Sequence, residues 1–288
     1  MEHDVAATED VLAEIRRVHG LELTARRRFA AGLQGGAWLV ADARDRPVVL
    51  KWNRHDSAAR MRQRSAAVGR ARAAGYPTPA WLAAGATEDG FAYCVQEFVP
   101  GEPSTPLTPA KTALLLEVLD TQAGLDPDPA TDRSVEVAAA AVADRPRQVL
   151  NELGAPGRAL IRRYDELLAG YGPVGLPGGD LAHGDFNSCN ILLREGRVSG
   201  VIDLDGLGSG TRVIDYACLL RECYVEGYGS AVSARIHRAA EAVAGPAVLA
   251  VCATVAAFFI VEFKLRHEPA AVPEVLSHLD QLAIDLAS

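Results

Sequence analysis

The sequence predicts an α+β protein with two lobes, a small antiparallel β-sheet lobe followed by a mainly helical lobe. Short apolar segments with strand character fill most of residues 22–99. A stretch dense in helix breakers follows at residues 100–106. Beyond it, apolar residues recur at helical spacing, apart from one strand-rich island at residues 181–205. We therefore place an N-terminal lobe at residues 1–98 and a C-terminal lobe at residues 99–288.

Composition is that of an ordinary globular protein. The chain has 288 residues, of which 49% are hydrophobic, so it can bury a substantial core. The longest apolar run, residues 247–261, is shorter than the roughly 18 residues that a membrane span needs, so we expect a buried helix behind Pro246. The cysteines are odd in number and lack CxxC spacing, which is typical of a reducing compartment. We expect a cytoplasmic protein without a membrane partner.

Net charge limits the partners. The formal net charge of -8 disfavours nucleic acid as a partner and is compatible with a cationic ligand. The arginine-rich segment 57–74 lacks interleaved aromatic residues, so we interpret it as a solvated helix face. No obligate protein partner is evident from the sequence.

The elements of the N-terminal lobe follow from periodicity and turn residues. Apolar residues of 11–18 lie on one helical face, and the Ala- and Arg-rich segment 57–74 should be a helix that ends at Gly75. Between and after these helices the sequence predicts strands at residues 22–30, 37–41, 47–52, 80–86 and 91–99. The hinge to the second lobe should lie at residues 97–101.

The C-terminal lobe should be mainly helical. Thr108 and Pro109 are a suitable N-cap and first-turn pair for a helix that extends to about Ala123. Helical patterns follow at residues 134–153 and 159–169, and helices should fill the chain after residue 205.

Three oxygen-bearing side chains should converge within the strand-rich island. Asp185 and Asn190 lie on a loop that enters the apolar strand 191–193, and Asp203 ends the next apolar strand, 201–202. A hairpin between the two strands, turning at residues 194–197, brings Asp203 back beside Asn190. Phosphoryl transfer requires a carboxylate beside the attacking hydroxyl and oxygen ligands for magnesium. The island therefore predicts such a site.

The motif His-Gly-Asp-x-x-x-x-Asn at residues 183–190, followed by an apolar strand and Ile-Asp-x-Asp at residues 202–205, resembles the aminoglycoside phosphotransferase and choline kinase superfamily. That superfamily has a protein-kinase-like fold. The sequence of the loop is more similar to that of its antibiotic phosphotransferase branch. The resemblance implies that Asp185 is the catalytic base and that Asn190 and Asp203 bind Mg²⁺. It also implies supporting roles, with His183 holding the loop, Asp205 supporting the metal site and Asp215 bracing the loop from beneath.

The same resemblance implies nucleotide contacts in the N-terminal lobe. Lys51 ends the strand 47–52, as does the phosphate-binding lysine of kinase-like folds. A glycine-containing loop and the hinge complete this set, with Gly32, Gly35 and Gly36 near the phosphates and Gln96, Glu97 and Phe98 near the base. One departure is clear, because segment 57–74 has no acidic residue to orient Lys51. Either Gln63 replaces that residue, or the phosphates alone position Lys51.

The predicted activity is that of a small-molecule kinase. It would transfer the γ-phosphoryl of ATP or GTP to a hydroxyl of a cationic antibiotic of the aminoglycoside or cyclic peptide type. Glu222, Glu226 and Glu262 are candidate acceptor-binding carboxylates, because a cationic acceptor favours an acidic cleft. Two alternatives remain: a metabolic kinase for choline, homoserine or a sugar, and a nucleotide-binding scaffold that no longer catalyses. A protein kinase is disfavoured, because the sequence has neither His-Arg-Asp nor Ala-Pro-Glu at the required places.

Overall fold

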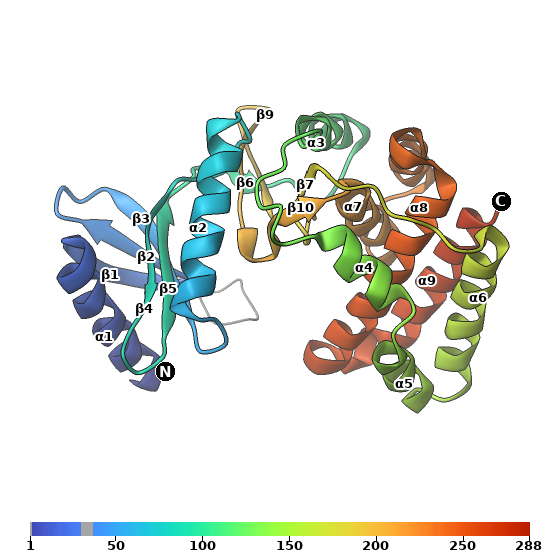
Figure 1. The fold of residues 1–288 in the computed structure, drawn as a ribbon, viewed down its shortest axis with the longest axis horizontal. Coiled ribbons are helices and arrows are strands. Elements are labelled where there is room, and N and C mark those ends of the chain that lie inside the picture. Colours follow the sequence, from blue (N-terminus) through green and yellow to red (C-terminus); the bar gives the residue numbers. More distant parts are fainter. Residues whose placement is uncertain (1, 30–36) are drawn as a thin grey trace. The chain divides into compact units, whose positions relative to one another are not determined.

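The computed structural model describes residues 2–29 and 37–288. The chain divides into two compact units, Met1–Pro100 and Gly101–Ser288. The first unit contains an antiparallel sheet with two helices, and the second is mainly helical (Figure 1). This arrangement confirms the predicted α+β fold class.

The N-terminal unit is built on a five-stranded sheet with the order β1-β2-β3-β5-β4. Every pair of neighbouring strands in it is antiparallel. The strands are β1 (Leu23–Arg28), β2 (Ala37–Asp42), β3 (Pro47–Asn53), β4 (Trp81–Ala86) and β5 (Ala92–Glu97), and the helices are α1 (Glu2–His19) and α2 (Ala58–Ala73). These strands agree with the predicted ones to within two residues at each end.

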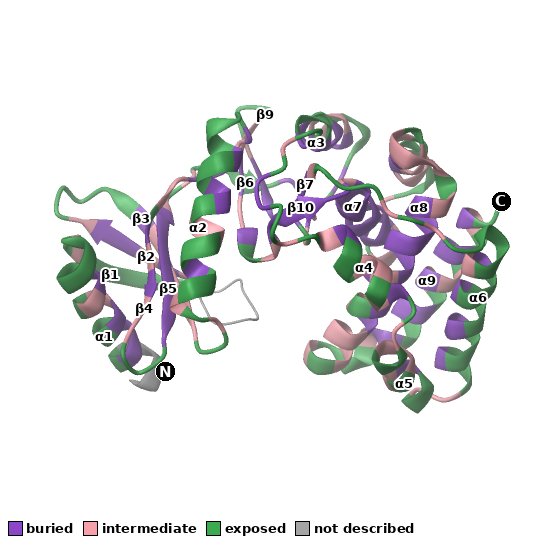
Figure 2. Ribbon diagram, viewed as in Figure 1, coloured by how far each residue is buried: buried purple, intermediate pink, exposed green. Residues whose placement is uncertain are grey.

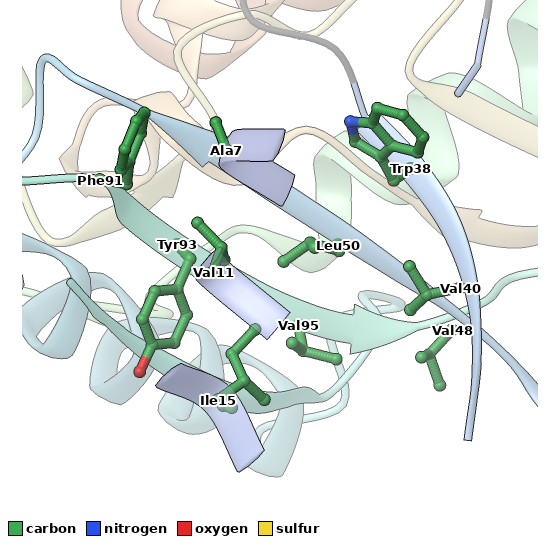
Figure 3. Packing of buried hydrophobic residues seen from close by; sticks show 11 residues of the cluster. Ala7, Val11, Ile15, Trp38, Val40, Val48, Leu50, Phe91, Tyr93 and Val95 are labelled. Carbon is green, nitrogen blue, oxygen red and sulfur yellow. The ribbon is translucent and has the colours of Figure 1, made fainter. Parts of the chain in front are cut away.

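The core of this unit lies between α1 and one face of the sheet. Ala7, Val11 and Ile15 recur at a spacing of four residues, so they share the face of α1 that packs against the strands (Figure 3). Leu50 of β3 belongs to this core and is fully buried. Successive side chains of a strand point to opposite faces, so Lys51 lies on the face away from α1.

Helix α2 presents its arginines mostly to solvent. Ser57 caps the helix by accepting a hydrogen bond from the Arg60 backbone N–H. Asp56, just before the helix, pairs with Arg64 at 2.8 Å and with Arg60 at 3.4 Å. The face that packs inward is apolar and consists of Met61, Ala67, Val68 and Ala71. The arginine-rich segment thus forms a solvated helix face, as the sequence indicates.

The C-terminal unit consists of seven helices and five short strands among the residues described. Its helices are α3 (Pro109–Thr121), α4 (Arg133–Ala141), α5 (Asp144–Glu152), α6 (Ala155–Tyr171), α7 (Val213–Val225), α8 (Ser230–His267) and α9 (Val272–Leu286). The strands are β6 (Glu102–Pro103), β7 (Asp180–Ala182), β8 (Ile191–Arg194), β9 (Arg197–Val201) and β10 (Gly208–Gly210), and two short 3-10 turns are η1 (Leu204–Gly206) and η2 (Pro269–Ala271). Helix α7 is buried along nearly its whole length and forms the centre of this unit (Figure 2).

The single helical segment expected at residues 134–153 is wrong, because the chain forms two helices there. Helix α4 ends at Ala141, and α5 begins at Asp144. Pro146 lies in the first turn of α5, where its missing N–H costs nothing. In a continuous helix its ring would clash with the carbonyl of Val142, so the chain must break before it.

Helix α8 contains the long apolar run. It is the only helix among the described residues that is long and apolar enough to cross a membrane by length and composition. Gly245 has non-helical dihedral angles, so a kink divides the helix just before Pro246, where we expected a buried helix to begin. Most of the apolar residues after this kink are buried, and the helix packs against α7, α4 and α9. The run therefore serves as a core helix of the C-terminal unit.

Candidate active site

The β8–β9 hairpin brings two of the predicted site residues together. The strands pair antiparallel, with Ile191 opposite Val201, and the turn lies between Arg194 and Arg197 as predicted. The Ile202 backbone N–H donates to the carbonyl of Asn190 at 2.9 Å. Asn190 immediately precedes β8 and Asp203 closely follows β9, so both lie at the same end of the ribbon.

Two asparagines hold Asp185 on the preceding loop. The side-chain nitrogen of Asn187 donates to Asp185 Oδ1 at 3.1 Å, and that of Asn190 donates to Asp185 Oδ2 at 3.3 Å. Both nitrogens also reach the Asp185 carbonyl, at 3.2 Å and 2.9 Å respectively. The carboxylate is thus fixed on both oxygens and remains half-buried.

His183 ties the loop to the end of β9. Its ring is buried, and Nε2 donates to the carbonyl of Ile202 at 2.9 Å. The Asp185 backbone N–H donates to Nδ1 at 3.3 Å. In these two contacts Nε2 is the donor of the ring and Nδ1 is its acceptor. His183 therefore links the residue before Asp203 to Asp185 itself.

Asp215 lies beneath the loop at the start of α7. Its carboxylate is fully buried and accepts hydrogen bonds from the backbone N–H groups of His183 at 2.7 Å and Gly184 at 2.8 Å. The side chain of Gln122 donates a third hydrogen bond at 2.9 Å. Burial raises the pKa of Asp215, and these donors oppose the rise. Asp215 therefore contacts the backbone at the start of the loop.

The segment that carries Asp203 packs closely against the loop. Asp203 has φ 65° and ψ 60°, the left-handed region that side chains rarely adopt. The backbones of Gly184 and Gly206 pack directly against each other. A Cβ on Gly206 would come within 2.7 Å of the His183 carbonyl oxygen. Backbone strain of this kind is concentrated at functional sites. Asp205 lies exposed in the turn η1 that follows.

Asn190 and Asp203 fit a magnesium ion. The amide nitrogen of Asn190 donates to Asp185, so its oxygen Oδ1 is the atom that can bind a cation. Within the described part of the chain, no group of three or more His, Cys, Asp or Glu residues gathers as a metal cage. Mg²⁺ is commonly held by one or two protein oxygen ligands together with phosphates and waters. Two oxygen ligands without a cage are consistent with that mode of binding.

Glu222, one of the predicted acceptor-binding carboxylates, lies against the loop that carries Asp185. This residue is only 9% exposed, and its carboxylate faces the loop at Ser188. It accepts a hydrogen bond from the Ser188 backbone N–H at 2.8 Å, and also hydrogen bonds from the Ser188 and Tyr228 hydroxyls. Ser188 in turn is joined to Ser104 through its carbonyl. Ser188 and Ser104 could not be found from the sequence, because contacts across such long stretches of chain leave no local pattern.

The other two acceptor candidates differ in their relation to the loop. Glu226 is exposed at the end of α7. After burial, the carboxylates of Glu222, Glu226 and Asp185 all contribute to the raised pKa of the Cys189 thiol. Glu226 therefore contributes negative charge at the loop that carries Cys189 and Asp185. Glu262 lies on α8 and pairs with Arg266 at 3.4 Å.

The predicted nucleotide contacts of the N-terminal unit lie on β3 and β5. Lys51 pairs in register with Ala37 and Cys94. Gln96 is buried, and Phe98 is partly exposed just after β5. Glu97 ties β5 to Ala80, because its backbone N–H donates to the Ala80 carbonyl and its carboxylate accepts from the Ala80 N–H. The predicted loop residues Gly32, Gly35 and Gly36 lie outside the described residues.

Comparison with known proteins identifies the family. The sequence matches the phosphotransferase enzyme family over residues 25–252. This match spans most of the chain, including the loop, the hairpin and Asp215. The chain therefore belongs to the phosphotransferase enzyme family and is a phosphotransferase. No curated protein shows a significant match to the sequence.

Solved structures of similar fold extend over nearly the whole chain. Aminoglycoside phosphotransferase APH(4)-Ia is 17% identical with a TM-score of 0.70, and the alignment covers 96% of this chain and 98% of that one. An aminoglycoside-3'-phosphotransferase of type VIII is 23% identical with a TM-score of 0.60, covering 88% and 98%. Macrolide 2'-phosphotransferase MphH from Brachybacterium faecium is 18% identical with a TM-score of 0.58, covering 94% and 97%. At these identities the likeness establishes the fold.

Proposed function

We propose that the protein is a small-molecule kinase that transfers the γ-phosphoryl group of a nucleoside triphosphate to a hydroxyl of a cationic antibiotic. The observation that carries the proposal is the fixed carboxylate of Asp185. Asn187 and Asn190 hold both of its oxygens, and Asn190 shares one end of a ribbon with Asp203. A scaffold that only binds nucleotide needs no carboxylate held in this way beside a metal site.

Each residue of the site has a distinct task in the proposed reaction. Asp185 orients the acceptor hydroxyl and takes its proton as the new phosphate ester bond forms. Asn190 and Asp203 would hold Mg²⁺, which neutralises charge on the phosphates when bound. His183 and Asp215 keep the loop in position through their backbone contacts. Most of the rate enhancement then comes from positioning of the reacting groups.

The nucleotide is proposed to bind through the N-terminal unit, which would serve as the nucleotide-binding lobe. Lys51 lies on the sheet face away from α1, as a phosphate-binding lysine on the third strand would. We propose that the backbone around residues 96–98 binds the base, with the Glu97 N–H excluded because it already donates to Ala80. The glycines at 32, 35 and 36 stay part of this proposal.

The choice of an antibiotic acceptor rests on two kinds of support. Structures of the fold relative APH(4)-Ia include a ternary complex with ADP and hygromycin B, and another relative is a macrolide phosphotransferase. In this chain, the exposed carboxylate of Glu226 acts on the loop that carries Asp185. A negative group there favours a cationic acceptor. A reducing cytoplasm, which the free cysteines suit, is the proposed location.

One alternative has an observation in its favour. Helix α2 contains no acidic residue that could orient Lys51, and Asp56 beside it is engaged with arginines. A nucleotide-binding scaffold without turnover would tolerate this arrangement. The alternative predicts magnesium-dependent nucleotide binding with no phosphorylated product.

The test of the proposed function is release of nucleoside diphosphate from ATP, and separately from GTP. The acceptor panel includes aminoglycosides, a cyclic peptide antibiotic, a macrolide, choline and homoserine. We expect one antibiotic class to stimulate release and to gain the mass of one phosphoryl group. Stimulation by choline or homoserine alone would assign the protein to metabolism instead. Nucleotide binding without stimulation by any compound would favour the scaffold.

A further inference from the structure

Helix α4 is fastened to the segment that follows Asp203. Asp132, which caps α4, forms an isolated bridge with Ser209, and the Ser134 hydroxyl accepts from the Thr211 backbone N–H at 2.8 Å. A third link comes from a charged side chain between them. Arg133 Nε donates to the Gly206 carbonyl at 2.7 Å, and a second nitrogen of the same guanidinium donates to the same oxygen.

Arg133 fits this place along its whole length. A Cβ on Gly208 would come within 2.9 Å of Arg133 Cγ, so the arginine stem packs against a residue that must lack a side chain. Glu136, one turn along α4, pairs with the guanidinium at 2.6 Å. The side chain of Arg133 is 21% exposed, whereas that of Glu136 is 54% exposed. The guanidinium is therefore committed to the Gly206 carbonyl, with Glu136 on its solvent side.

The opposite side of Gly206 contacts the catalytic loop. Gly206 packs against His183 and Gly184, whose backbone N–H groups are held by Asp215. Gly206 is thus held between Arg133 on one side and the loop on the other. Asp203, three residues earlier, has a left-handed backbone that the surrounding contacts must maintain. Replacement of Arg133 would remove one of the contacts that hold this strained segment.

We propose that Arg133 is a positioning residue that holds Asp203 in place for magnesium by clamping Gly206 against the catalytic loop. The inference rests on the proposed function, because it assumes that Asp203 is a metal ligand. Residues that orient a ligand from behind typically change metal affinity or activity by about 10- to 100-fold when they are replaced. Arg133 touches neither the acceptor nor the phosphates in this assignment, and it acts through the backbone alone.

The experiment measures the magnesium dependence of nucleotide binding, with fluorescent ATP and GTP analogues as probes. Arg133→Ala should raise the Mg²⁺ concentration for half-maximal binding by about tenfold. Arg133→Lys keeps the charge and much of the stem but not the paired N–H groups, so its value should lie between those of wild type and Arg133→Ala. Arg163→Ala is the matched control, because Arg163 also forms a partly exposed ion pair in this unit, with Asp280. Its magnesium dependence should equal that of the wild type.

A second comparison separates positioning from general stability. In an Asp203→Ala background, Arg133→Ala should cause no further change in magnesium dependence, because the group it positions is absent. The same fold-change in both backgrounds, or a wild-type magnesium dependence in Arg133→Ala and Arg133→Lys, would overturn the inference. If Arg133→Ala does not fold, the magnesium dependence of Arg133→Lys is compared in the wild-type and Asp203→Ala backgrounds instead. A wild-type protein that binds neither probe at any Mg²⁺ concentration would instead contradict the proposed function itself.

Discussion

Asp203 is the residue whose backbone most clearly departs from ordinary geometry at the site. Asp203 adopts this left-handed conformation just after the end of β9, at the end of the ribbon where Asn190 lies. Such conformations cost on the order of 1–3 kcal/mol for residues other than glycine, so they persist where the surroundings enforce them. The surroundings here are the His183 ring, which holds Ile202, and the packing of Gly206 on Gly184.

Replacement of Asp203 should therefore act on magnesium rather than on folding alone. Asp203→Ala should weaken magnesium-dependent nucleotide binding by more than about tenfold, because it removes an oxygen ligand. Asp205→Ala should have a smaller effect, since Asp205 is exposed in the following turn. Isothermal titration with nucleotide at a series of Mg²⁺ concentrations measures both. Equal losses in the two variants would contradict the assignment of Asp203 as the ligand.

The stability of the folded protein should depend on pH through the carboxyl group of Glu222. Burial raises the pKa of this carboxyl above its ordinary value, although Ser188 and Tyr228 donate to it. An acid whose pKa is raised on folding contributes stability below its unfolded-state pKa, and that contribution is lost as pH rises through the folded-state value.

The free energy of unfolding of wild type relative to Glu222→Gln should therefore fall as pH rises from about 4.5 towards neutrality. Urea unfolding of the two proteins at matched pH values measures the difference. The absolute difference also contains the hydrogen bonds that glutamine cannot accept, so only its change with pH is diagnostic. A relative stability of the wild type that grows over this range would contradict the assignment.

At the scale of elements, local patterns predicted most of the fold, and contacts between distant segments escaped prediction. Strand alternation and helical periodicity located the sheet, and the spacing from Asp185 to Asp203 predicted the β8–β9 hairpin. The break between α4 and α5 had a visible signal in Pro146, which the helical pattern around it obscured. The contacts of Glu222 with Ser188 and of Arg133 with Gly206 join residues far apart in sequence, so no spacing could reveal them.

The close packing of α5 on α6 can be tested at Gly157 of α6. Gly157 lies where a Cβ would approach the Leu150 carbonyl oxygen to 1.9 Å, a distance that no side chain can accept. Gly157→Ala should therefore destabilise the protein by roughly 1–3 kcal/mol, the usual range for a steric conflict in a packed core.

Gly170 of the same helix is the matched control, because a Cβ there meets nothing within 4 Å. Gly170→Ala should stabilise the protein by roughly 0.5–1 kcal/mol, since alanine is the better helix former. Thermal unfolding of the two variants compares them directly. Similar shifts of Tm in the same direction would contradict the packing described for α5 and α6.

At the scale of the whole molecule, the two units divide the proposed work. The sheet of the N-terminal unit carries Lys51, and the helical unit carries the loop with Asp185, the ribbon and the buried support of α7. The long apolar helix α8 belongs to the core of the second unit, where its kink at Gly245 separates two helical parts. Family membership establishes a phosphotransferase.

In the proposed reaction, Asp185 makes this molecule a catalyst and not only a nucleotide-binding protein. The most direct measurement compares wild type with Asp185→Ala, using the acceptor that stimulates nucleoside diphosphate release. We expect kcat of the variant to fall by about 10²- to 10⁴-fold, while the Kd for the magnesium-nucleotide complex stays unchanged. Turnover in the variant equal to that of the wild type would show that Asp185 is not the catalytic base.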